Sequence, residues 1–108
     1  MGNAYVKLKR YQEAIKVYKQ AIRINSDDAK AYYELGYFLG RFERYDEANE
    51  ALKKAIRINL DNVDTHYLLG ITYLLVTDRD KGAAIEEYKI LKKLDPNVAE
   101  KLFNVLYR

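Results

Sequence analysis

The sequence contains no cysteine among its 108 residues. Disulfide bonds, thiolate catalysis and cysteine-based zinc sites are therefore excluded. Proline occurs once and glycine five times, and so few helix-breaking residues favour long helices over many short strands. Residues 67–76 form the most apolar run, which is about half of the roughly 20 residues that a membrane-spanning helix needs. We therefore expect a helical protein with no direct membrane insertion.

A strong charge of one sign is also missing. The 19 basic and 16 acidic residues give a net charge of +3, and they are interspersed along the chain. Nucleic-acid binding is typical of a clustered basic patch, so we expect no nucleic-acid partner. The first residues lack the basic, apolar and small-residue segments of a secretion signal. A soluble, cytoplasmic location is therefore the default expectation.

An internal repeat organises the sequence. Gly2, Gly36 and Gly70 stand 34 residues apart, and residues 14–25 match residues 48–59, with the shared ending Ala-Ile-Arg-Ile-Asn. A third copy starts at Ala84, two residues late, which places a two-residue insertion in the turn Thr77–Gly82. A fixed period of this length is typical of a solenoid built from stacked helical units.

Apolar residues recur at three- and four-residue steps within each copy, which indicates two amphipathic helices per repeat. The predicted helices are 2–8, 11–24, 28–40, 45–58, 62–76, 80–94 and 97–107. The predicted division is a truncated first repeat (1–27), a second (28–61), a third with the insertion (62–96) and a C-terminal helix (97–108). Acidic and amide residues at 27–28, 61–62 and 95 suit helix N-caps, and Pro96 suits the first helical turn.

Small residues stand at repeated positions where helices are expected to approach closely, since no bulky side chain intervenes. Gly36 and Gly70 belong to the first helix of a pair, and Ala48 and Ala84 to the second. Ala55 keeps the spacing to the next repeat. We expect Leu52 and Tyr88 to fill the space beside these small residues.

This pattern resembles the tetratricopeptide repeat family over nearly the whole chain. The second copy carries it on Tyr32, Leu35, Gly36, Leu39, Tyr45, Ala48, Leu52 and Ala55, and the third on His66, Leu69, Gly70, Tyr73, Ala84, Tyr88, Leu91 and Pro96. The resemblance implies an all-α, right-handed solenoid of antiparallel helix pairs, with about three repeats and a C-terminal helix. It also implies a scaffold for other proteins.

In such arrays the first helices of the pairs line a concave groove. Carried over by register, the resemblance implies a partner-binding groove formed by Asn3, Lys7, Lys30, Tyr33, Glu34, Tyr37, Arg41, Asp64, Tyr67, Leu68, Ile71, Leu75, Phe103 and Tyr107. Tyrosine offers a large contact area at small entropic cost. We expect an amphipathic helix or an extended apolar segment of a partner there. The alternative stays open that neighbouring helices already bury the apolar members.

Some members of this family bind acidic chaperone tails through a carboxylate clamp. Asn3 matches that clamp, but Glu34 stands where it needs asparagine, and Asp64 and Leu68 stand where it needs lysine and arginine. Acidic and apolar groups cannot hold a carboxylate. We therefore expect no clamp ligand of this kind.

Residue sets typical of enzymes are absent. The sequence has no glycine-rich phosphate loop, no serine–histidine–acid set and one histidine, His66, which occupies the core position of Tyr32 one repeat earlier. The acidic runs 27–28 and 78–80 are too short for a calcium loop of about 12 residues. We predict no catalytic residue, no metal and no cofactor.

Two functions remain. The first is a scaffold that binds a peptide or protein partner in the groove. The second is a self-assembly module, because the first repeat lacks most of its first helix while the C-terminal helix is apolar on two sides. Solenoid ends normally carry a polar outer face, so one molecule could fill the vacancy of another, head to tail or by exchange.

Overall fold

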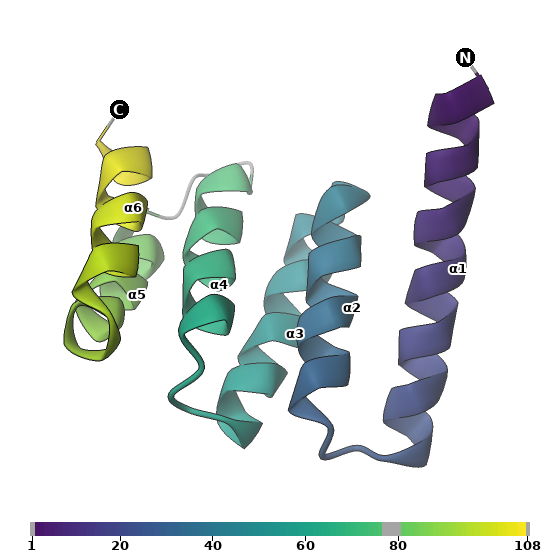
Figure 1. Ribbon diagram of the computed structural model, residues 1–108, viewed down its shortest axis with the longest axis horizontal. Helices are drawn as coiled ribbons and strands as arrows, with labels where there is room; N and C mark the ends of the chain where they lie inside the picture. The colour runs from purple at the N-terminus through teal and green to yellow at the C-terminus, as the bar shows by residue number, and fades with distance from the viewer. Residues whose placement is uncertain (1, 77–80, 108) are drawn as a thin grey trace.

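The computed structural model describes the backbone of residues 2–76 and 81–107, and the side chains of residues 9–76 and 81–107. Within these ranges it has six helices, and Figure 1 shows them packed in sequential antiparallel order, with α3 and α5 behind α2, α4 and α6. Their bounds are α1 Gly2–Ile24, α2 Ala29–Arg41, α3 Tyr45–Ile58, α4 Val63–Leu75, α5 Lys81–Leu94 and α6 Pro96–Leu106. This is the all-α arrangement that the repeat predicted.

Three helices start at the capping residues that the sequence indicated. Asp28, Asn62 and Asp95 are the N-caps of α2, α4 and α6, and each side chain accepts a hydrogen bond from an amide in the first turn. These bonds satisfy donors that a helix otherwise leaves free. Pro96 follows in the first turn of α6, where its missing N–H costs nothing. From residue 28 onward, the predicted helix ends agree with the structure to within one residue.

The first helix corrects a prediction. We expected separate helices at 2–8 and 11–24, but α1 runs unbroken from Gly2 to Ile24. Lys9 and Arg10, between the two expected helices, are good helix formers, and no glycine, proline or N-capping residue stands there. In the second copy, by contrast, Gly40 precedes the turn at residues 42–44.

Gly36 permits the close contact between α2 and α3. A Cβ atom at this position would lie 2.7 Å from both Cγ and Cδ2 of Leu52 and 3.3 Å from the carbonyl oxygen of Ala48. Leu52 and Ala48 are fully buried, so neither has room to move away. The structure places Gly36 and its small partner Ala48 at this close contact.

Gly70 is equally tight, but a different helix fills the space beside it. A Cβ there would lie 2.7 Å from Cδ2 of Leu102 in α6. We expected Tyr88 of α5, the counterpart of Leu52, in this place. Tyr88 instead lies with its ring centroid 5.7 Å from that of Phe103. The last helix therefore fills the place beside Gly70 that the repeat assigned to α5.

Two apolar clusters form the interior. The N-terminal core joins α1, α2 and α3, and the C-terminal core joins α5 and α6 with side chains of α4 packed against it. The N-terminal core consists of Ile15, Leu35, Leu39, Ala48 and Ala51, with Tyr18, Ile22, Phe38 and Phe42 against it. The C-terminal core consists of Ala84, Leu91, Ala99, Leu102 and Leu106. Ala55 is also buried.

The predicted insertion at Thr77–Gly82 falls mainly on residues 77–80, which lie outside the described residues. In the described part of the chain, none of the helices combines the length and the apolar character that crossing a membrane requires.

Candidate binding groove

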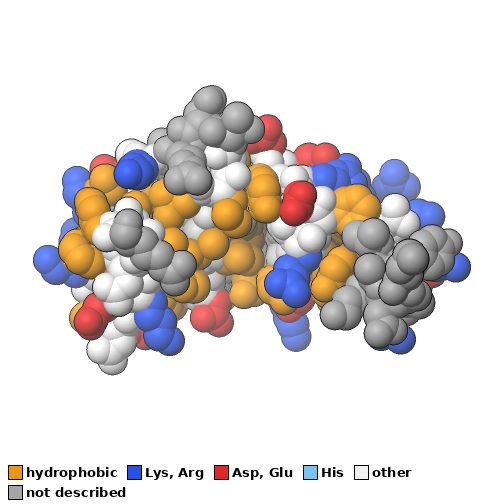
Figure 2. All heavy atoms as spheres, turned by 90° about the horizontal axis from the view of Figure 1, so that it is seen from above, with side chains coloured by type: hydrophobic (Ala, Val, Ile, Leu, Met, Phe, Trp, Pro, Cys, Tyr) orange, Lys and Arg blue, Asp and Glu red, His pale blue; other side chains and the backbone are white. Residues whose placement is uncertain are grey.

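Two hollows open between α2 and α4, at opposite ends of this helix pair. The first, the apolar hollow, has a volume of about 410 Å³ and lies where α2 and α4 end. It is lined by Tyr11, Tyr37, Gly40, Arg41, Glu43, Tyr45, Leu68, Ile71, Thr72 and Leu75. Figure 2 looks onto this end of the molecule and shows hydrophobic side chains gathered over its middle and its α4–α6 side. We call the two hollows together the groove.

Large apolar side chains of the apolar hollow remain open to solvent. Leu75 is 50% exposed and Tyr37 is 39% exposed, whereas Ile71 also packs against the C-terminal core. Neighbouring helices thus bury only part of this surface. The five residues that the sequence predicted here, Tyr37, Arg41, Leu68, Ile71 and Leu75, do line one hollow.

Aromatic rings hold the wall of the apolar hollow in place. Phe38, which packs against the N-terminal core, meets Tyr37 edge-on at 5.3 Å and Tyr11 at 5.9 Å between ring centroids. The guanidinium of Arg41 lies 5.9 Å from the centroid of the Tyr37 ring. Hydrogen bonding to the Tyr11 side chain raises the pKa of Arg41 above its ordinary range. The positive charge at this end is therefore held close to the two tyrosines.

Tyr11 and Tyr45 are lining residues that the sequence analysis missed. Tyr11 lies in the part of α1 that the repeat assigned to a second helix, and Tyr45 begins α3, also a second helix. The resemblance assigned the groove to first helices alone. The Arg-Tyr pair recurs at Arg10-Tyr11 and Arg44-Tyr45. That repeated pair is the signal that could have identified them.

The turn that ends α2 shapes the rim of the same hollow. Glu43 has a φ of 63°. This left-handed backbone conformation is unfavourable for residues other than glycine. Its N–H donates to the carbonyl of Gly40, and the N–H of Arg44 donates to the carbonyl of Leu39. This pattern is a Schellman motif, which usually places glycine at the position of Glu43.

The second hollow, the acidic hollow, has a volume of about 330 Å³ and lies where α2 and α4 begin. It is lined by Ala29, Lys30, Tyr33, Glu34, Ala55, Asn59, Asn62, Asp64 and Thr65. Burial raises the pKa of the Tyr33 hydroxyl, and the negative charges of Asp64 and Glu34 raise it further. Both carboxylates therefore act on one tyrosine from two different helices.

Three other predicted groove residues, Tyr67, Phe103 and Tyr107, lie outside both hollows. Tyr67 is half-buried and packs against the C-terminal core. Phe103 lines a separate hollow of about 370 Å³ beside Tyr88, between α5 and α6. Tyr107 is 61% exposed, and its ring lies tilted against that of Phe103 with 4.7 Å between the centroids. The side chains of Asn3 and Lys7 lie outside the described residues.

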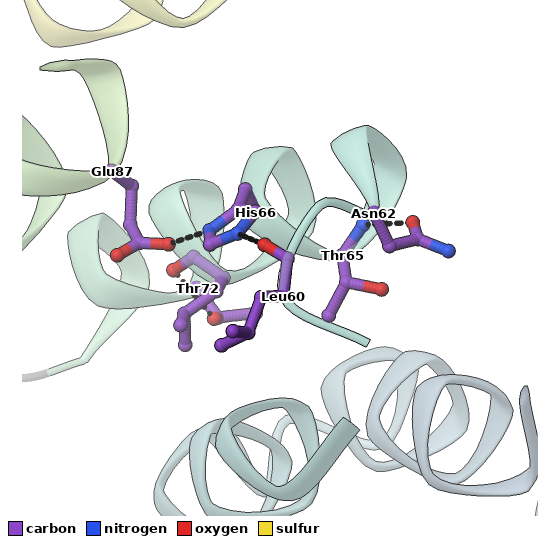
Figure 3. Close-up of polar contacts among 7 residues, drawn as sticks. Leu60, Asn62, Thr65, His66, Thr72 and Glu87 are labelled. Atoms are coloured by element: carbon purple, nitrogen blue, oxygen red, sulfur yellow. Dashed lines mark hydrogen bonds and ion pairs between the residues drawn. The ribbon is translucent and has the colours of Figure 1, made fainter. Parts of the chain in front are cut away.

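A buried polar pair lies between α4 and α5 (Figure 3). His66 is buried, as predicted, but Nδ1 of its ring lies 2.7 Å from a carboxylate oxygen of Glu87, and Nε2 lies 2.7 Å from the backbone carbonyl of Leu60. Because that carbonyl can only accept, Nε2 carries a proton. The hydrogen bond to Glu87 raises the pKa of His66, although burial opposes the shift. The result is a buried histidine–carboxylate pair, and its hydrogen bond favours the protonated form of the imidazole.

Glu87 is only 8% exposed, whereas its neighbour Glu86 lies open to solvent. Among the described residues, no group of three side chains could hold a metal ion, so the pair stands without further ligands. Its position between two helices indicates a structural role.

The fold and the groove invite comparison with known proteins. A family model for the TPR, or tetratricopeptide, repeat matches residues 2–41 and 43–76. The chain belongs to the tetratricopeptide repeat family. Members of this family mediate binding of proteins and peptides, and they are typically non-enzymatic. No curated protein matches the chain significantly.

Solved tetratricopeptide structures resemble the chain closely in fold. A crystal structure of MamA is 27% identical, with a TM-score of 0.82 over 98% of this chain and 62% of that one. A MamA RS-1 double mutant is 26% identical, with a TM-score of 0.76 over 89% of this chain and 53% of that one. The chain thus spans little more than half the length of these MamA proteins.

A further tetratricopeptide domain resembles the chain in fold alone. The first repeat domain of Spaghetti (RPAP3), bound to the HSP90 peptide SRMEEVD, is 19% identical, with a TM-score of 0.79 over 99% of this chain and 88% of that one. At this identity the likeness carries no information about the ligand.

Proposed function

We propose that this tetratricopeptide chain is a scaffold that binds a peptide or helix of a partner protein in the groove between α2 and α4. The observation that carries the proposal is the apolar hollow, where Tyr37 and Leu75 stay exposed beside Leu68 and Ile71. Exposed apolar surface in a concave site stabilises a complex when a partner removes it from water. A cytoplasmic location suits such a scaffold.

Tyrosine adds specificity to this surface. Tyr37 and Tyr33 lie one helical turn apart on α2 and reach into different hollows. A tyrosine ring buries a large area, and its hydroxyl orients a polar partner group. Their α2 backbone is fixed by the N-terminal core, so little entropy remains to be lost on binding.

Affinity capture from the source organism tests the proposal. Tyr37→Ala removes an exposed ring from the groove, and Leu68→Glu places a charge in it. Both variants are expected to lose partners that the unchanged protein retains. Ile24→Glu is the matched control, because Ile24 is an 80% exposed apolar residue of α1 outside either hollow. Circular dichroism checks that all variants keep their helices. Equal capture by the groove variants and the control would contradict the proposal.

Self-assembly is the second candidate function, and the outer face of α6 is the observation that favours it. Phe103 is 43% exposed and contacts the ring of Tyr107, which is more exposed still. A second copy could cover these rings. Light scattering over a concentration series tests this candidate, with Phe103→Ser as the variant expected to block association. A monomer at high concentration would contradict it.

A further inference from the structure

The two ends of the groove differ in charge. In the acidic hollow, the carboxylates of Glu34 and Asp64 outnumber the single ammonium of Lys30. Neither carboxylate forms an ion pair with any residue of the ranges 9–76 and 81–107. Other glutamates do form such pairs, namely Glu47 with Arg44, Glu50 with Lys53 and Glu86 with Lys89. The acidic hollow therefore carries negative charge that the described residues leave unneutralised.

Tyr33 adds an aromatic surface to these two charges. It lines the same hollow, and both carboxylates lie close enough to disfavour ionisation of its hydroxyl. A cation gains from an aromatic ring and from nearby carboxylates together. The N-terminal ends of α2 and α4 oppose a cation through their dipoles. Asp28 caps α2 with a carboxylate that does not line the hollow and offsets that helix end. Asp64 lies in the first turn of α4 and offsets part of the second dipole itself, which leaves Glu34 as the carboxylate that faces no helix end of its own.

Resting on the proposed function, we infer that the groove selects an extended partner segment with a lysine or arginine in the acidic hollow and a large apolar side chain in the apolar hollow. The charge of the acidic hollow complements the first group. The exposed Leu75 and Tyr37 complement the second.

The helix geometry sets the spacing of these two groups. Asp64 and Ile71 stand seven residues apart on α4, which corresponds to about 10 Å along the helix axis. An extended chain advances about 3.4 Å per residue. The basic and apolar residues of the partner are therefore expected about three positions apart. Acidic residues at the basic position of the partner would meet Glu34 and Asp64 and be repelled.

Selection from a displayed library of random 12-residue peptides tests the inference with the full chain as bait. The expected consensus is a lysine or arginine about three positions from leucine, isoleucine, phenylalanine or another large apolar residue. Selection of acidic peptides, or of apolar peptides without a basic position, would overturn it.

A charge-neutralised variant sharpens this test. Glu34→Gln with Asp64→Asn is expected to weaken binding of a selected peptide about fivefold or more at low salt, since two exposed ion pairs are lost. Glu13→Gln with Glu50→Gln is the matched control, because it removes the same charge from exposed positions outside both hollows. Equal loss in the two variants would indicate a general effect of net charge and would overturn the inference.

The outcomes separate the inference from the proposed function. If Leu68→Glu abolishes peptide binding while the selected peptides show no basic position, the groove is the site and the inference fails. If Leu68→Glu leaves peptide binding unchanged, the groove itself is wrong and both fail.

Discussion

The two halves of this solenoid are built from the same repeat but differ in interior chemistry. In the N-terminal half, Ala51 of α3 is a buried apolar residue of the core. Its counterpart Glu87 in α5 is buried too, but forms an ion pair with His66 across α4 and α5. Repeat register thus determines which positions are buried, whereas the identity of each residue determines how its burial is stabilised.

The glycines of the two halves also differ in the helix that they contact. Gly36 contacts Leu52 of its own repeat, while Gly70 contacts Leu102 of the next helix. The close approach is shared, but the helix that fills the space is different. Stability of the C-terminal half therefore depends on α6 as well as on its own helix pair.

Among the changes considered, loss of the Glu87 carboxylate is expected to lower the free energy of unfolding most. Glu87→Ala leaves Nδ1 of His66 buried without a partner, and removing one member of a buried pair costs about 3–5 kcal/mol of unfolding free energy. The N-terminal half already has alanine at the equivalent position, Ala51, so it has no such pair to lose. Urea denaturation measures the difference.

The double variant His66→Leu with Glu87→Ala is the control for that prediction. Leucine fills the equivalent register position in α6, at Leu102. The double variant is expected to lose less stability than the two single variants added together, because the orphaned charge is gone. Additive losses would show that the two side chains are not coupled.

Glycine substitutions test close packing in the N-terminal half. Gly36→Ala is expected to destabilise the protein by about 1–3 kcal/mol, because the added methyl overlaps fixed atoms of Leu52. Gly40→Ala is the matched control on the same helix, since among the described side chains only Thr72 lies near its added Cβ, at 3.9 Å. That control is expected to gain about 0.5–1 kcal/mol from helix propensity. Thermal unfolding of both variants measures the contrast, and equal effects would contradict it.

The buried pair of His66 and Glu87 predicts that the stability of the C-terminal half depends on pH. The pKa of His66 in the folded protein lies above its ordinary 6.5, chiefly through the hydrogen bond to Glu87. Its contribution to stability is therefore complete below pH 6.5 and is lost as the pH rises through the raised pKa, with a slope of at most about 1.4 kcal/mol per pH unit for one proton. Denaturation at several pH values measures this slope. The same slope in His66→Leu would rule out the pair as its source.

The smallest expected effect concerns Asn49. Its carbonyl oxygen is the one buried side-chain polar atom, within residues 9–76 and 81–107, that has no hydrogen-bond partner. Ile15 and Ile85 stand at the same position in the other copies. Asn49→Leu, which has the same shape without the polar atoms, is expected to stabilise the protein by about 1 kcal/mol. A loss of stability in urea denaturation would show that the amide is needed.

Much of the fold could be predicted because repeat spacing and capping residues are local signals. The N-caps at Asp28, Asn62 and Asp95 fixed helix starts without any knowledge of packing. The continuous α1 could not be predicted by register, because the repeat implied a turn that Lys9 and Arg10 do not favour locally. The outcome there depended on local propensity and not on the repeat.

The pairing of His66 with Glu87 lay beyond sequence reasoning for another reason. Glu86 and Glu87 are adjacent and chemically identical, and only packing decides which one points inward toward a histidine 21 residues away. The lining of the groove could be predicted only in part. Register placed Tyr37 and Leu68 on neighbouring helices, but it also added Phe103, which lines a separate hollow between α5 and α6.

The most direct test of the binding groove is an NMR titration of the ¹⁵N-labelled protein with a peptide selected from the library. The groove predicts that the largest shift changes fall on Tyr33, Tyr37, Leu68 and Ile71, with the amides of α5 nearly unmoved. Shift changes concentrated instead around Phe103 and Tyr107, or on the outer faces of α3 and α5, would contradict it.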